Sequence, residues 1–167
     1  MKHQLILILA LTLTQATYSQ KITTFTDPTT QTRWLMTDVA DLNPMLNPAT
    51  EGICYVNFRV AGDVVNLYLQ GRGVAIGPKD FIAFIMDKDT VVVHSTGAQP
   101  GGPVSTHGGP HLHEYAVSRD DLSRLSHGGN LNQVLVSDYL GMQEVKVFNH
   151  HDRLAAYAAA LLKAMGN

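Results

Sequence analysis

Four histidines lie close together in the sequence and are the side chains best suited to chemistry: His94, His107, His111 and His113. Neutral imidazole nitrogens are good ligands for Zn²⁺ and Cu²⁺. His111 and His113 are two residues apart, so in a β-strand both side chains point to the same face. The spacing therefore makes a site for Zn²⁺ or Cu²⁺ one of two interpretations of these histidines.

The elements around these histidines must bring them together. Residues 91–95 and 111–117 are both expected to be strands, separated by a glycine- and proline-rich segment over 96–110. If the two strands pair around this loop, His94 comes close to His111, and His107 lies on the connecting loop. The favoured interpretation is a set of ordinary surface histidines, or of histidines that bond backbone groups, since the spacing matches no established zinc motif.

A polar and aromatic pattern runs along a second pair of predicted strands. Tyr55 and Arg59 alternate with apolar residues in 53–60, and Tyr68 follows in 64–70. Tyrosine and arginine are enriched at protein interfaces, which makes Tyr55, Arg59 and Tyr68 a candidate interaction surface. The alternative is the ordinary solvated face of an antiparallel sheet.

No motif in the sequence specifies a reaction. A Gly-x-Ser-x-Gly nucleophile motif is absent, and Gly71-Arg72-Gly73 lacks the Lys-Ser/Thr of a phosphate loop. The sequence therefore favours a non-enzymatic domain that binds a protein or small-molecule partner. A metal-binding protein or metalloenzyme that uses the histidines is the second hypothesis.

The first residues of the chain have the pattern of a secretory signal peptide. Lys2 and His3 precede an apolar run over 5–13, and the small residues Thr17 and Ser19 follow. The apolar run is shorter than the roughly 20 residues that span a bilayer. We therefore predict that residues 1–19 are removed and that the protein is secreted or periplasmic. No later stretch is apolar for long enough to predict a transmembrane segment.

Composition limits the remaining possibilities. The formal net charge is −2 and there is no basic run, so we do not expect nucleic acid as a partner. The one cysteine, Cys54, cannot form a disulfide within the chain. About 150 residues remain after the signal, enough for one domain with its own core. We expect an extended lead-in over 20–32 and a single globular domain over 33–167.

The hydrophobic pattern predicts mostly strands and two helices. Expected strands are 53–60, 64–70, 81–86, 91–94, 111–117, 131–137 and 143–148. Ser118 and Asp121 resemble a capping box at the start of a short helix. An apolar stripe over 154–165 predicts an amphipathic C-terminal helix. This order is not βαβ alternation, so we predict an α+β fold. Its mostly antiparallel sheet, or sandwich, carries the short internal helix and has the C-terminal helix packed on it.

Overall fold

The structure is a computed structural model, and it describes residues 21–38, 40–41, 53–71, 77–98, 111–138, 141–147 and 151–166. The strands are β1 (Ile22–Thr26), β2 (Arg33–Thr37), β3 (Ala40–Asp41), β4 (Ile53–Ala61), β5 (Val64–Gly71), β6 (Phe81–Met86), β7 (Thr90–Ser95), β8 (His111–Val117), β9 (Leu131–Asp138) and β10 (Gly141–Lys146). The helices are α1 (Arg119–His127) and α2 (Arg153–Met165).

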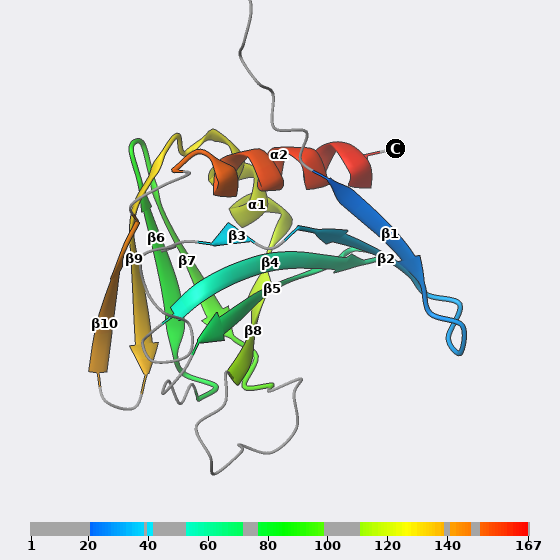
Figure 1. The fold of residues 1–167 in the computed structure, drawn as a ribbon, viewed down its shortest axis with the longest axis horizontal. Coiled ribbons are helices and arrows are strands. Elements are labelled where there is room, and N and C mark those ends of the chain that lie inside the picture. The colour runs from blue at the N-terminus through cyan, green and yellow to red at the C-terminus, as the bar shows by residue number, and fades with distance from the viewer. Residues whose placement is uncertain are drawn as a thin grey trace, which may run out of the picture.

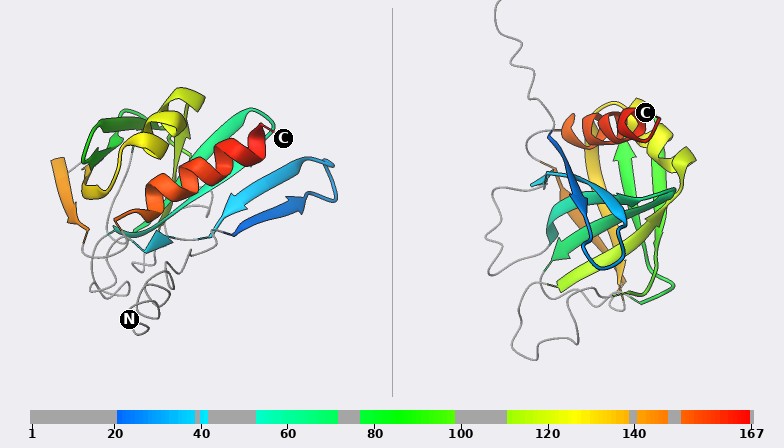
Figure 2. Two further views of the ribbon diagram at one scale, coloured as in Figure 1. Left: turned by 90° about the horizontal axis from the view of Figure 1, so that it is seen from above. Right: turned by 90° about the vertical axis from the view of Figure 1, so that its right-hand side faces the viewer.

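The ten strands form one sheet, and every pairing in it is antiparallel. The strand order is β1-β2-β4-β5-β8-β7-β6-β9-β10, with β3 paired to β4. The sheet is strongly curled, and both helices lie across its open side (Figures 1 and 2). The predicted α+β class with an antiparallel sheet is confirmed, as one continuous sheet and not as a sandwich.

Alternation along the strands separates an inner face from an outer face. Along β4 the inner-face side chains Val56, Phe58 and Val60 are at most 2% exposed. They belong to one buried apolar cluster that also contains Leu122 of α1 and Leu161 of α2. The inner face of the sheet and both helices therefore contribute to the same core.

Helix α1 begins with the predicted capping box. The Ser118 hydroxyl accepts a hydrogen bond from the Asp121 N–H at 3.0 Å. In return, the Asp121 carboxylate accepts one from the Ser118 N–H at 3.1 Å. These two bonds satisfy N–H groups that a helix start otherwise leaves without partners. Asp120 and Asp121 in the first turn also suit the positive end of the helix dipole.

We expect Ser118→Ala to lower the free energy of unfolding by about 1 kcal/mol, because the Asp121 N–H loses its acceptor. Ser118→Gly should cost only about 0.3 kcal/mol, because glycine leaves the N–H open to water. Urea denaturation of both variants measures the difference. Equal stability of Ser118→Ala and the wild type would contradict a stabilising role for this cap.

Helix α2 buries the predicted apolar stripe. Its buried residues are Leu154, Tyr157, Ala158 and Leu161, which follow the i, i+3, i+4, i+7 spacing. Asp152 occupies the N-cap position of α2 but makes no capping hydrogen bond. Its backbone is already helical, with φ −84° and ψ −16°, whereas a capping side chain needs an extended backbone.

The segment that we expected as a lead-in contributes strand β1 at one edge of the sheet. Ile22 pairs with Thr37, and the other β1 residues pair with β2 in register. The turn between the strands is held by Asp27, whose carboxylate accepts hydrogen bonds from the Thr29 and Thr30 N–H groups. These bonds hold the pKa of Asp27 below its ordinary value. Isoleucine, threonine and phenylalanine favour extended structure, so the local sequence suits a strand.

Candidate functional site

The sheet separates two of the histidines that we expected to converge. Strands β7 and β8 pair as predicted, with His94 opposite Ala116. His94 therefore lies exposed on the outer face, where its ring meets the edge of Phe81 with the ring centroids 6.2 Å apart. His113 has the opposite parity along β8 and is only 2% exposed, on the inner face. The prediction of one metal site that includes both His94 and His113 is therefore wrong.

The reason for this separation is the register in which β7 and β8 pair. We expected His94 to lie close to His111, but His94 pairs five residues further along β8. A shift of one residue already moves a side chain to the other face of a sheet. His111 begins β8 opposite Gly71, but its side chain is outside the described part of the chain, as is all of His107. Among the described residues, no group of three His, Cys, Asp or Glu side chains could hold a metal ion.

The outer face brings together two of the three residues predicted to form an interaction surface. The Arg59 guanidinium lies over the Tyr68 ring, 4.3 Å from its centroid, in a cation–π contact. The Tyr68 hydroxyl donates to Glu114 Oε2 at 2.6 Å, and Glu114 Oε1 accepts from the Thr96 hydroxyl at 3.1 Å. Burial, and then the hydrogen bond with Glu114, raises the pKa of Tyr68, so it stays neutral. The third residue, Tyr55, is part of β4, but its side chain lies outside the described part.

Apolar side chains continue this surface towards the edge of the sheet. Strand pairing aligns Met36 with Arg59 and Trp34 with Phe25. Their neighbour Leu35 is buried on the inner face, so alternation puts these four on the outer face. We define the outer-face patch as Phe25, Trp34, Met36, Arg59 and Tyr68, of which Tyr68 is only 5% exposed and lies under the Arg59 guanidinium. Phe25 is 52% exposed, which is unusual for a phenylalanine.

Among the described residues of this patch, Arg59 carries the positive charge. Its Nε atom is buried and has no hydrogen-bond partner. The two ion pairs found in the described part of the chain both involve Arg124 instead. Leaving a buried donor without an acceptor costs about 1–3 kcal/mol. The Arg59 guanidinium therefore lies over the Tyr68 ring with a buried Nε donor that has no acceptor.

A second polar group of side chains lies at one end of the inner face, and no pattern in the sequence predicted it. Tyr115 on β8 lies opposite Ser95 on β7, and the Ser95 N–H donates to the Asp80 carbonyl at 2.9 Å, just before β6. Asp138 ends the next strand, β9. His113 lies two residues before Tyr115 on the same face. We call Asp80, Ser95, His113, Tyr115 and Asp138 the inner-end cluster.

Tyr115 is the unusual member of this cluster. Its side chain is fully buried, yet its hydroxyl has no hydrogen-bond partner. Burial raises the pKa of Tyr115, and the negative charges of Asp80 and Asp138 raise it further. Asp80 itself accepts hydrogen bonds from the Gly77 N–H at 2.6 Å and from the Ser137 hydroxyl at 2.7 Å.

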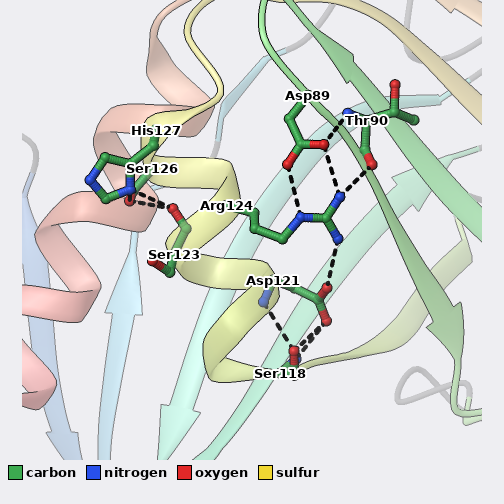
Figure 3. A network of polar contacts seen from close by, with 8 residues as sticks. All are labelled: Asp89, Thr90, Ser118, Asp121, Ser123, Arg124, Ser126 and His127. Carbon is green, nitrogen blue, oxygen red and sulfur yellow. Dashed lines mark hydrogen bonds and ion pairs between the residues drawn. The ribbon is translucent and has the colours of Figure 1, made fainter.

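Figure 3 shows the hydrogen bonds and ion pairs between α1 and the neighbouring turn, where the described residues also line a hollow. It is lined in part by Arg124, whose Nε and Nη2 atoms donate to the two Asp89 oxygens at 2.8 and 2.9 Å. Nη2 also donates to the Thr90 carbonyl at 2.9 Å. Arg124 therefore already has hydrogen-bond partners, and its bonds connect α1 to the turn between β6 and β7.

We expect Arg124→Gln to raise the pKa of Asp89. The Arg124 hydrogen bonds lower that pKa below its ordinary value of 3.8. Because the folded-state pKa is depressed, this interaction stabilises the fold above the ordinary pKa. The contribution is lost as the pH falls through the lower, folded-state pKa. NMR titration of the Asp89 carboxyl carbon measures the shift, and an unchanged midpoint in the variant would contradict the assignment.

The chain resembles no known protein closely enough to carry over a function. No family model matches it, and neither does any curated protein or solved structure. In the described part of the chain, neither helix has the length and apolar character needed to cross a membrane. The two groups of side chains defined above are therefore the basis for assigning a function.

Proposed function

We propose that this protein is an exported, non-enzymatic binding module that docks a protein partner on the outer-face patch. The observation that carries the proposal is Arg59, whose guanidinium is stacked on Tyr68 and whose buried Nε has no acceptor. The Arg59 side chain as a whole is partly exposed, so a partner carboxylate would pair with the guanidinium, and arginine binds carboxylates with two parallel hydrogen bonds. Phe25, Trp34 and Met36 supply apolar contacts next to the charge, so the fitting partner segment carries an acidic residue beside an apolar one.

The surroundings of Arg59 favour binding over a purely structural role. The chain of hydrogen bonds from Tyr68 through Glu114 to Thr96 crosses neighbouring strands of the sheet. It fixes the ring on which the guanidinium rests, so little conformational freedom would be lost on binding. Aromatic side chains, methionine and arginine are also the residues enriched in the centres of interfaces.

The proposal is tested with a defined acidic peptide. In an NMR titration, N-acetyl-Phe-Glu should perturb backbone amides of β2, β4 and β5, whereas N-acetyl-Phe-Gln should perturb them far less. Arg59→Gln should weaken binding of the acidic peptide about tenfold or more, because a charged hydrogen bond is lost. Arg119→Gln, an exposed arginine on α1, is the matched control and should bind like the wild type.

Two results would reject this docking surface. One is equal binding of the acidic and amide peptides. The other is equal binding by Arg59→Gln and the wild type while both remain folded by circular dichroism. Either result would mean that the outer-face patch is an ordinary sheet surface and not a docking site.

Export is part of the proposal and has its own test. The support is the basic, apolar and small-residue pattern over 1–19. We expect the mature protein to begin within a few residues of Gln20. N-terminal sequencing of protein from the periplasm or medium checks this, and a mature chain that still starts at Met1 would reject export by this signal.

Zinc binding is the second candidate function, now without His94. His113 lies on the inner face, and His111 begins β8 two residues before it. His107 precedes both in the sequence. Calorimetry with ZnCl₂ should find binding that weakens as pH falls through about 6.5, because ligating imidazoles must be neutral. The variant His111→Ala/His113→Ala should lose the binding, and a wild type that binds neither zinc nor copper rejects this function.

A further inference from the structure

We propose that β1 is a self-association site, at which it pairs antiparallel with β1 of a second copy of this chain and joins the two sheets into one. β1 stands at one end of the strand order, and among the described strands only β2 pairs with it. The hairpin of β1 and β2 extends beyond α2 at the periphery of the molecule (Figures 1 and 2). The outer side of an edge strand offers backbone N–H and C=O groups to which another strand can bond.

The first argument is the direction of the backbone groups in β1. At the end of the strand, the Asp27 N–H donates to the Thr32 carbonyl at 2.9 Å, and the Asp27 carbonyl accepts from the Gln31 N–H at 2.8 Å. Both backbone groups of Asp27 therefore point towards β2. Because this direction alternates along an antiparallel strand, the N–H and C=O groups of Thr24 point away from β2, to the open edge. The same holds for the residues two before and two after Thr24.

The second argument is the symmetry of the strand. Thr24 is the middle residue of Ile22–Thr26, so a two-fold axis beside it aligns β1 with its copy over the whole strand. Thr24 then lies opposite its own copy, and Ile22 lies opposite Thr26 of the second copy. In this register the outward backbone groups of both strands meet and exchange about six hydrogen bonds. Paired residues are an even number apart, so the inner faces of the two sheets continue each other.

The third argument is charge complementarity. The same register places Lys21 of each copy opposite Asp27 of the other. Lys21 is exposed. The N–H groups of Thr29 and Thr30 hold the pKa of Asp27 below its ordinary value, so its carboxylate is ionised at neutral pH. Opposite charges that face each other across an antiparallel pair stabilise it, and the symmetry makes this contact twice.

The composition of the two sheet edges supports β1 as the one that pairs. β10, at the other end of the strand order, carries Glu144 and Lys146 within the strand. Charged side chains on an edge strand oppose the addition of another strand. β1 contains isoleucine, threonine and phenylalanine only, and its residues from Thr23 to Thr26 are exposed. The strand that matches both its backbone groups and its flanking charges is a second β1.

Sedimentation equilibrium of the purified protein tests the association. Because the contact is one short strand pair, we expect weak dimerisation, with a Kd of about 100 µM. Denaturation at much lower concentrations then reports on the monomer. Thr24→Lys should weaken dimerisation about tenfold or more, because it places two ammonium groups opposite each other at the axis. Lys21→Glu should also weaken it, because each glutamate then faces Asp27 of the other copy.

Lys79→Glu is the matched control, since it makes the same charge change at an exposed position before β6. It should dimerise like the wild type. The proposal is overturned if the wild type stays monomeric at about 1 mM, tenfold above the expected Kd. It is also overturned if Thr24→Lys and Lys21→Glu, folded by circular dichroism, both dimerise like the wild type.

Disulfide crosslinking tests the register directly. Across the axis the two Thr24 Cα atoms should lie about 5.5 Å apart, within the range that a disulfide spans. In air-saturated buffer, where dissolved oxygen oxidises the two thiols, Thr24→Cys should form a linked dimer. Thr26→Cys makes the same change where the two copies are about 13 Å apart, and it should remain unlinked. The wild type controls for linkage through Cys54, and equal linkage of both variants would overturn this register.

Discussion

Replacing Leu161 with aspartate should unfold the domain or lower its free energy of unfolding by about 4 kcal/mol or more. Leu161 is fully buried in the middle of the α2 stripe, in the cluster that joins the helices to the sheet. The substitution removes a leucine from the core and buries a carboxylate with no partner. Because domains of this size are stable by only about 5–15 kcal/mol, this loss takes a large share of the total.

Ala159→Asp is the matched control, since Ala159 lies exposed on the same helix. It should cost less than about 1 kcal/mol, mainly through the lower helix propensity of aspartate. Thermal and urea denaturation followed by circular dichroism compares the two variants. If Leu161→Asp melts within a few degrees of the wild type, α2 does not belong to the cooperative core.

Phe84→Ala should lower the free energy of unfolding by about 3–5 kcal/mol, the usual range for a buried phenylalanine. Phe84 is fully buried on β6, between Val91 of β7 and Val134 of β9. All three side chains face the core, so truncating Phe84 leaves a cavity that the paired strands cannot easily close. Urea denaturation measures the loss.

Phe25→Ala provides the contrast, because Phe25 is 52% exposed on the outer face of β1. We expect it to change stability by less than about 1 kcal/mol. Similar large losses for both variants would mean that Phe25 is buried in solution, for example by self-association through β1. Sedimentation analysis of the wild type would detect such association.

The candidate interaction surface was partly predictable because it is built locally. Arg59 and Tyr68 lie on consecutive strands joined by the tight turn at Gly62 and Asp63, where Gly62 has φ +59°. A short turn sets the register of a hairpin, and period-two alternation then puts both side chains on one face. The contact between guanidinium and ring follows from that register.

The separation of His94 from His113 could not be predicted, because it depends on a register that is not local. Strands β7 and β8 are joined through a long segment, so no tight turn fixes which β8 residue lies opposite His94. The inner-end cluster was missed for the same reason. Asp80, Tyr115 and Asp138 come from three separate segments, and only the strand order brings them to one end of the sheet.

The sequence by itself determined the features that depend on neighbours a few residues apart: the capping box at Ser118, the buried stripe of α2 and the hairpins β4–β5 and β6–β7. Helix caps, helical periodicity and tight turns are short-range effects, so they can be read from a short stretch of chain. Only the tertiary structure decided the pairing of β5 with β8, the opposite faces of His94 and His113, and the burial of an unpaired Tyr115 hydroxyl. These depend on which distant strands bury the most apolar surface together, and that is a property of the whole chain.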